Sequence, residues 1–510
     1  MRQFARARRT RASPSFFRLW LGFFLVLSAV GALWAVANPL GNSADEPAHI
    51  SRAASVVRGD PIGKHVAHQP AAFTEISVPR TYALTLNGSG GLTGAHDCYH
   101  FRPTVPASCE KTQSSSRTVR VATYVGRYPL LYYAAVGLPS LLTNSLAGVY
   151  LMRVMSVLLS AALLAVAFAV ARKWGASPLL VGALMVVATP TEVFLAASVN
   201  PNGLEVAAAI CLWAVGSVLV LDCATDPPTG LVIATAGSAC VLALTRPIST
   251  VWVFLAVATF AAAGWARVPV RMLLARRDVQ AAIVAVATAS AAAVTWVVAV
   301  RGLTVVPEGP IAPGTPLTRV ASVAASQLWL GLAQSAGTFG WDDTHEPELA
   351  VAALVFALSI PFVLCLARAP RRDVRVLLGL LGLSAIVPLA LVVAAARRDG
   401  IEAQGRYFVP LWVGVPIFAA ATQHSLPRVR ARRLSRAMAL SAAAGLVLAF
   451  WWNLHRVTVG DQGPYLPWNT TATAWRPPLP ATLLDAAAVV AVGLYAAVTL
   501  RLGIRREELS

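Results

Sequence analysis

Two adjacent carboxylates and a histidine, Asp45, Glu46 and His49, stand directly after the first long apolar run of the chain. Asp45 and His49 are four residues apart, so on a helix their side chains share one face. A carboxylate beside an imidazole can act as a general base on an acceptor hydroxyl or can bind a divalent cation. Ser43 and Glu46 also match a capping box, in which Glu46 has a structural role. Because that box leaves Asp45 unexplained, Asp45 is the better candidate base, with Glu46 and His49 as further catalytic candidates.

A second polar cluster lies at residues 397–407, a short segment that holds three arginines although the charge pattern places it outside the cytoplasm. Arginine suits phosphate oxygens because its planar fork of donors makes paired hydrogen bonds. Anchoring to lipid headgroups is the alternative role for such a segment. We predict that Arg406 is the main phosphate ligand of a substrate-binding set that also contains Arg397, Arg398, Gln404 and Tyr407.

A third cluster, residues 337–347, combines glycines, aromatic residues and acids. Trp341 can stack on a sugar ring, and Asp342 can accept hydrogen bonds from sugar hydroxyls. The alternative is aromatic packing at the membrane interface, followed by a helix that starts at Asp343 or Thr344. We therefore assign Trp341 and Asp342 to the candidate substrate site.

The composition is that of a membrane protein, because 57% of the 510 residues are hydrophobic and 13% are charged, whereas a soluble domain has about 25% charged residues. The net charge of +19 is high enough to suggest a nucleic-acid partner. Most arginines, however, fall in short loops between apolar runs. That distribution follows the positive-inside rule of membrane topology, and not the continuous basic groove that tracks phosphates. We expect membrane lipids as partners and no nucleic acid.

The apolar runs predict an all-α polytopic protein with about twelve transmembrane helices and both termini inside. Residues 1–15 and 504–510 are expected in the cytoplasm, and residues 16–503 form one transmembrane domain. Its large polar segments, 38–147, 301–347 and 453–480, are expected to face outward. The first of these is the large first extracytoplasmic loop. The predicted spans are 16–37, 149–171, 178–198, 203–221, 229–246, 248–265, 279–300, 348–367, 374–396, 408–422, 435–452 and 482–502.

The six cysteines divide into two groups. Cys98 and Cys109 lie in the first polar loop, where an extracytoplasmic location permits a local disulfide between them. Two free thiols are the alternative. The other four cysteines lie in or beside apolar runs and are expected to be small buried side chains. The sequence shows no phosphate-cradling glycine loop and no paired Cys-x-x-Cys pattern, so ATP-driven chemistry and a zinc site are not supported.

Five motifs stand in the order seen in a family of predicted bacterial membrane proteins, catalogued as domain of unknown function 2142. The motifs are Asp45-Glu46-Pro47-Ala48-His49, residues 127–133, Asn200-Pro201-Asn202, Phe339-Gly340-Trp341 and Gln404-Gly405-Arg406-Tyr407. The resemblance spans about residues 16–450. That family in turn is similar to the GT-C glycosyltransferases, which place an acidic pair in the first outer loop and a His-Pro-Pro-Leu-like segment later in that loop. Here Tyr128 stands where that histidine is usual, which leaves open whether Tyr128 takes part in chemistry or in packing.

The resemblance implies a GT-C-like fold in the bacterial plasma membrane, with an active face outside the cytoplasm. It implies an inverting transfer of a sugar from a polyprenyl-phosphate donor to a glycan, lipid or protein acceptor. Asp45 is then the base or the ligand of a divalent cation, and Arg406 binds the donor phosphate. This interpretation requires Asp45 and Arg406 to face the same outer cavity. A transporter or lipid flippase and a non-catalytic envelope-assembly protein are the alternative functions.

Overall fold

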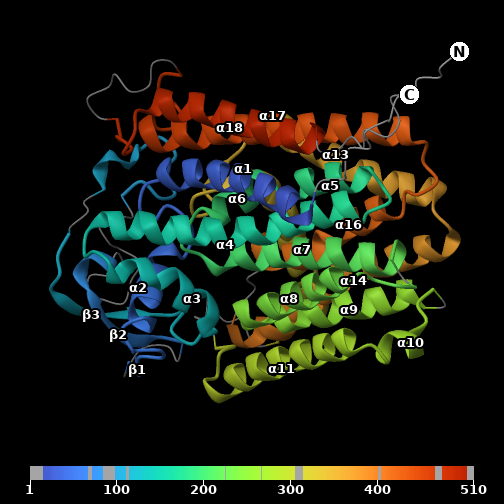
Figure 1. Ribbon diagram of the computed structural model, residues 1–510. Helices are drawn as coiled ribbons and strands as arrows, with labels where there is room; N and C mark the ends of the chain where they lie inside the picture. Colours follow the sequence, from blue (N-terminus) through green and yellow to red (C-terminus); the bar gives the residue numbers. More distant parts are fainter. Residues whose placement is uncertain are drawn as a thin grey trace, which may run out of the picture.

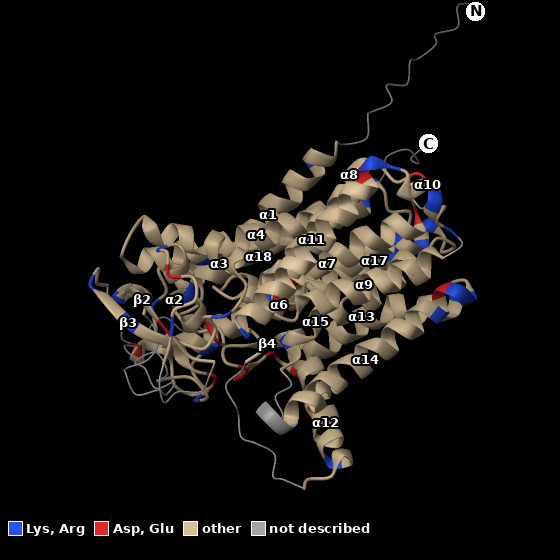
Figure 2. Cartoon of the chain, turned by 90° about the horizontal axis from the view of Figure 1, so that it is seen from below, with Lys and Arg blue, Asp and Glu red and all other residues tan. Residues whose placement is uncertain are grey.

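A computed structural model describes residues 15–66, 72–83, 98–110, 114–223, 225–265, 267–304, 314–399, 404–465 and 474–501, except for the side chains of residues 397–399. These residues form a bundle of helices with a small β-sheet beside one end (Figure 1). Lys and Arg gather at the two ends of the bundle, near α10 (Val270–Leu274) and near β3 (Thr118–Thr123), as Figure 2 shows. The mainly uncharged middle is the part that suits a membrane.

Eight helices in the described residues are long and apolar enough to cross a membrane. Large apolar side chains are exposed on the bundle, such as Phe254 and Leu349, which suits helices that face lipid. The chain is therefore the all-α polytopic membrane protein that its apolar runs predict. The eight helices are α1 (Phe16–Val36), α4 (Leu146–Lys173), α7 (Pro201–Leu221), α11 (Arg277–Ala299), α13 (Glu348–Arg368), α14 (Arg371–Asp399), α17 (Arg428–Val459) and α18 (Ala481–Arg501).

The predicted count of twelve spans is not confirmed, because several apolar runs form short or broken helices. The run at 178–198 divides into α5 (Leu179–Val187) and α6 (Pro190–Ala196), which are bent by 63°. Proline cannot donate a backbone hydrogen bond and is favoured at the first turn of a helix, so Pro190 starts a new helix. Three other runs are short: α8 (Thr229–Thr245), α9 (Ser249–Gly264), and the pair α15 (Val409–Trp412) and α16 (Gly414–Ala421).

The first polar loop builds a compact layer beside the bundle, seen next to α4 in Figure 1. Its helices are α2 (Glu46–Val56) and α3 (Leu130–Gly137), and short 3-10 turns cover 80–82, 107–109 and 138–141. Its antiparallel sheet has the order β1 (Lys64–His65), β2 (Thr74–Pro79), β3, with Thr74 opposite Thr123 and Pro79 opposite Thr118. Cys98 and Cys109 are joined by a disulfide. This layer holds α2 at the C-terminal end of α1 (Figure 1).

Two further segments approach α2 from later parts of the chain. Helix α12 (Leu317–Gly337) leads into the hairpin of β4 (Thr338–Phe339) and β5 (Thr344–His345), and a short turn η4 spans Gly405–Tyr407. Gly405 lies against the backbone carbonyl of Gly331 in α12, where any Cβ would collide. This close approach fixes η4 against α12. The hairpin is tied to α2 by a hydrogen bond of 3.1 Å from the Ala44 amide to the Gly340 carbonyl.

Candidate functional site

Asp45 is held in a left-handed backbone conformation at the start of α2, with φ 65° and ψ −6°. Such a conformation costs a non-glycine residue roughly 1–2 kcal/mol, and residues of this kind cluster at functional sites. The carboxylate accepts hydrogen bonds from the Tyr124 hydroxyl at 2.6 Å and from Arg406 Nη2 at 3.0 Å. Its side chain remains 22% exposed. Asp45 is therefore fixed in place and can still reach a substrate.

Arg406 joins the first and third clusters of the sequence. Its guanidinium, 6% exposed, bonds to Asp45 through Nη2 and to Asp342 Oδ2 through Nη1, each at 3.0 Å. Asp342 lies in the β4–β5 turn and also has a left-handed backbone, with φ 62°. Two motifs that are 361 residues apart along the chain are thus in direct contact. The requirement that Asp45 and Arg406 face one site is met.

The charges around Asp45 keep it ionised. Burial opposes ionisation, but the charge of Arg406 and the Tyr124 hydrogen bond together lower the pKa of Asp45 below its usual value. At neutral pH this carboxylate is an anion that can accept a proton. A low pKa makes it a weak base as long as Arg406 stays bound, because base strength follows the pKa.

His49 lies one helical turn after Asp45 and is neutral. Burial lowers the pKa of His49 to about 3, although the charge of Asp45 acts in the opposite direction. Its Nδ1 shares a hydrogen bond of 2.8 Å with the Tyr133 hydroxyl, and its ring lies 5.9 Å from the ring of Tyr128. The side chain is 2% exposed. His49 is therefore placed to orient tyrosines at the site, and it does not carry charge there.

Glu46 has a structural position, and the predicted capping box is wrong. The N-cap of α2 is Asp45, and the Ser43 hydroxyl is buried without a hydrogen-bond partner. Glu46 is fully buried and forms a two-pronged ion pair with Arg153 of α4, with oxygen–nitrogen distances of 2.7 and 2.6 Å. Its oxygens also accept the amides of Gly41 and Val199. No part of this carboxylate faces a substrate.

The remaining predicted binding residues lie around Arg406 to different extents. Tyr407 places its ring 5.3 Å from the Arg406 guanidinium and 4.8 Å from that of Arg246. Trp341 is half-buried, donates to the Gly41 carbonyl at 3.1 Å and lies against the His100 ring. Gln404 is half-buried beside η4, with its side-chain oxygen unpartnered. The side chains of Arg397 and Arg398 lie outside the described residues.

Two buried ion pairs at the site were missed by the sequence analysis. Arg153 pairs with Glu46, and Arg246 pairs with Glu205 of α7 at 2.8 Å. Arg246 also lies over the ring of Tyr128 at 6.0 Å. The signal in the sequence was the position of Arg153 and Glu205 within apolar runs. Ionisable residues at membrane depth are rare and are usually paired or functional, so each of these two residues indicated a partner elsewhere in the chain.

The carboxylates at the site do not fit a divalent cation as they stand. In the described residues, no group of three His, Cys, Asp or Glu side chains is placed to hold a metal. Asp45 and Asp342 approach each other through Arg406, whose guanidinium already supplies the positive charge between them. The guanidinium of Arg406 therefore neutralises the two carboxylates in place of a metal ion.

An apolar groove opens beside Arg406. Its volume is about 670 Å³, and it is lined by α5, α6, α12, α13, α14, α15 and α16. Ser335 lines this groove and also the small pocket that contains Asp342 and Arg406. Apolar side chains such as Leu332, Phe362 and Trp412 cover most of its wall. The charged site thus stands at the end of a space suited to a lipid chain.

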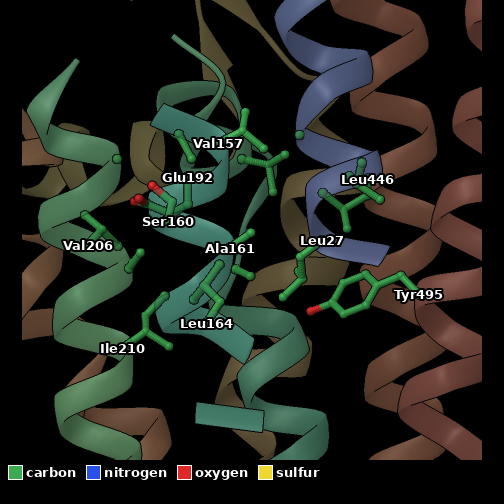
Figure 3. A pocket seen from close by; sticks show the side chains of 17 residues that line it. Leu27, Val157, Ser160, Ala161, Leu164, Glu192, Val206, Ile210, Leu446 and Tyr495 are labelled. Carbon is green, nitrogen blue, oxygen red and sulfur yellow. The ribbon is translucent and has the colours of Figure 1, made fainter. Parts of the chain in front are cut away.

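A smaller pocket of about 40 Å³ lies on the other side of α6, among α1, α4 and α7. Figure 3 shows Glu192 and Ser160 beside one another, with the Tyr495 hydroxyl pointing toward the pocket from the other side. The side-chain oxygens of all three residues are buried without hydrogen-bond partners. Glu192 lines this pocket and the apolar groove alike, so its carboxyl stands between the two spaces.

Comparison with known proteins gives a match to one family and matches to distantly similar solved structures. The family described as "Predicted membrane protein (DUF2142)" matches residues 28–415. The crystal structure of ArnT from Cupriavidus metallidurans in the apo state is 13% identical, with 96% of this chain and 77% of that chain covered and a TM-score of 0.38. The structure of the same ArnT bound to undecaprenyl phosphate is 14% identical, with 95% and 77% covered and a TM-score of 0.37. A likeness this distant carries no argument about function. No curated protein matches the chain.

Proposed function

The chain belongs to the family of predicted membrane proteins described as DUF2142, and we propose that it is a glycosyltransferase that moves a sugar from a polyprenyl-phosphate donor to an acceptor outside the cytoplasm. The observation that carries this proposal is the contact of Arg406 with Asp45 and Asp342 beside an apolar groove. A polyprenyl-phosphate sugar needs a place for its chain, a cation for its phosphate and a base near the first carbon of its sugar. All three are adjacent at this site.

In the proposed reaction, the donor chain lies in the groove and its phosphate contacts Arg406. The acceptor hydroxyl attacks the first carbon of the sugar, the bond from that carbon to the phosphate oxygen breaks, and the hydroxyl proton passes to Asp45. Arg406 stabilises the negative charge that develops on the leaving phosphate. Trp341 and Asp342 stand close enough to Arg406 to contact the sugar.

Arg406 also couples donor binding to the strength of the base. In the described state its charge helps to lower the pKa of Asp45. When a donor phosphate draws Arg406 away from Asp45, that pKa rises toward the ordinary range, and the carboxylate becomes a better proton acceptor. The base is therefore weak while Arg406 contacts Asp45 and stronger once a donor phosphate draws Arg406 away.

The test is transfer of a radiolabelled sugar from polyprenyl phosphate to membrane acceptors by the purified chain in nanodiscs. Asp45→Asn and Arg406→Gln should each reduce transfer at least about 100-fold, since loss of a general base or of a charge-stabilising group typically costs that much. Glu75→Gln is the matched control, because Glu75 lies in β2 with 39% of its side chain exposed. Full activity of Asp45→Asn, or unchanged envelope glycans in a deletion strain, would count decisively against a glycosyltransferase.

A lipid flippase is the second candidate, and the break between α5 and α6 favours it. Broken helices and buried acids often mark the substrate path of a transporter, and Glu192 lies beside this break. A flippase should move a fluorescent polyprenyl-phosphate lipid across vesicles whether or not Asp45 is replaced. Movement that stops in Asp45→Asn, or no movement at all, removes this candidate.

A further inference from the structure

Arg52 is a buried cation that forms no ion pair with any carboxylate in the described part of the chain. It lies in α2 with no exposed surface, and its Nη2 donates to the Tyr128 carbonyl at 3.2 Å. Its Nε and Nη1 have no hydrogen-bond partner. Burial lowers the pKa of Arg52 to about 10, so the guanidinium remains charged at neutral pH. A buried charge that is neither paired nor fully hydrogen-bonded is strongly unfavourable.

The other buried arginines show what is missing at Arg52. Within the described part of the chain five arginines are buried, and four of them have a carboxylate within 4.0 Å. Those four are Arg153 with Glu46, Arg246 with Glu205, Arg406 with Asp45 and Asp342, and Arg456 with Asp343. Asp60, whose charge acts on Arg52, is bound instead to the amides of Gly63 and Ser77. Among the described residues, no carboxylate is therefore in direct contact with Arg52.

Arg52 extends the row of site residues along α2. Asp45, His49 and Arg52 follow one another at helical spacing of four and three residues, so they lie on one face of the helix. Tyr133 connects the last two, because its hydroxyl bonds to His49 and its ring lies 5.4 Å from the Arg52 guanidinium. At 1.5 Å of rise per residue, Arg52 stands roughly 10 Å along the helix from Asp45.

We propose that Arg52 binds an anionic group of the acceptor, a phosphate or a carboxylate, about 10 Å from the hydroxyl that reacts at Asp45. The distance rests on the proposed glycosyl transfer, whereas the anion site itself does not. The donor phosphate cannot bind Arg52 while its sugar reacts at Asp45, because that phosphate is bonded directly to the sugar carbon that reacts. Two free N–H groups of one guanidinium match the paired oxygens of a carboxylate or phosphate. Because Arg52 has no exposed surface, the anion reaches it only when the tyrosines around it move. Tyr128 is the tyrosine suited to such a movement, because its side chain is only half-buried.

Binding of simple anions to the purified full-length chain tests this site. The protein is placed in nanodiscs of neutral phosphatidylcholine, and its melting midpoint is measured against inorganic phosphate, glucuronate or glucose at ionic strength matched with chloride. We expect saturable stabilisation by phosphate, by glucuronate or by both, and none by glucose. The anion whose stabilisation is lost in Arg52→Gln identifies the group that the site takes. If neither anion stabilises the wild-type chain beyond chloride, the proposal is overturned without any variant.

Variants then locate the binding. Arg52→Gln should weaken the apparent affinity at least about tenfold, because hydrogen bonds to charged groups contribute enough free energy for such a change. Arg120→Gln, at an arginine whose side chain is 74% exposed in β3, should bind like wild type. Unchanged affinity in Arg52→Gln would overturn the proposal and leave Arg52 as a support for the Tyr128 carbonyl. Arg406→Gln separates the two proposals, because it should reduce sugar transfer at least about 100-fold and keep the part of the stabilisation that Arg52→Gln removes.

Discussion

The two adjacent acids Asp45 and Glu46 should respond in opposite ways to loss of their charge. Glu46 is fully buried, and its oxygens accept four hydrogen bonds, two from Arg153 and one each from the amides of Gly41 and Val199. Replacement by glutamine keeps the shape but removes the negative charge and turns one acceptor into a donor. Arg153, 1% exposed, is then a buried cation without its partner.

The size of the effect follows from this geometry. Removing one partner of a buried ion pair typically costs about 3–5 kcal/mol, which we expect for Glu46→Gln. Asp45 is partly exposed and accepts from Tyr124 and Arg406, so Asp45→Asn should cost only about 1–2 kcal/mol. The rate of sugar transfer should show the reverse order, with Asp45→Asn inactive and any folded Glu46→Gln protein active.

Thermal melts of the purified variants in one detergent, followed by fluorescence-detected size exclusion, measure the stability. The transfer assay is then run on the fraction that remains folded. Arg153→Met with Glu46→Met is the informative double variant, because it removes both charges and should recover stability relative to Glu46→Gln. A wild-type melting midpoint for Glu46→Gln, or a larger loss of stability for Asp45→Asn, would refute the assignment of one acid to structure and the other to chemistry.

Three further results are expected. The pKa of His49 is about 3 in the folded state, against an ordinary value of 6.5, so between these pH values the imidazole takes up a proton more readily in the unfolded chain. The stability of the protein should therefore fall as the pH drops from about 6.5 toward 3. The melting midpoint of His49→Gln should depend less on pH than that of the wild type. Replacing Cys98 and Cys109 by serine should lower the free energy of unfolding by roughly 2–3 kcal/mol, as expected for a disulfide that closes a short loop. If the oxidised and the reduced wild-type protein melt at the same temperature, this prediction is wrong. Both carboxyl oxygens of Glu192 are buried and unpartnered. Glu192→Leu should therefore increase the free energy of unfolding by about 1–3 kcal/mol, which is measured as a higher melting midpoint. A lower midpoint would show that the Glu192 carboxyl makes a stabilising interaction in the folded protein.

The sequence predicts the membrane fold better than it predicts the number of spans. Long apolar runs such as those of α1 and α4 are sufficient to form helices, because hydropathy and length decide their environment. The count is not confirmed where a run contains an internal break, as at Pro190, or forms a shorter apolar helix, as in α8. A break and a short helix both leave the mean hydropathy of the run unchanged. Both also leave backbone N–H and C=O groups without a partner in their own helix, and neighbouring helices must satisfy these groups.

At the candidate site, local patterns identified residues but not their roles. Asp45 and Arg406 were chosen as charges that local structure did not explain, and Asp342 as an acceptor for sugar hydroxyls. The structure brings all three into contact through Arg406. Glu46 was kept as a further catalytic candidate, with a capping box as its structural role, because its true partner Arg153 is 107 residues away on α4. Long-range pairing of this kind leaves no local signal. Arg52 was likewise overlooked, since a charge at its position in a polar loop is ordinary until burial is known.

Arg406 also connects the two strained residues of the site. Asp45 and Asp342 both have left-handed backbones, with φ values of 65° and 62°, and both carboxylates bind the same guanidinium. At roughly 1–2 kcal/mol for each residue, the strain is comparable to the strength of one hydrogen bond to a charged group, about 1.5–3 kcal/mol. A donor phosphate that competes for Arg406 thus removes a contact that offsets this strain in both turns. The acid that accepts the proton and the acid that faces the sugar would then be released together, only when a phosphate is present.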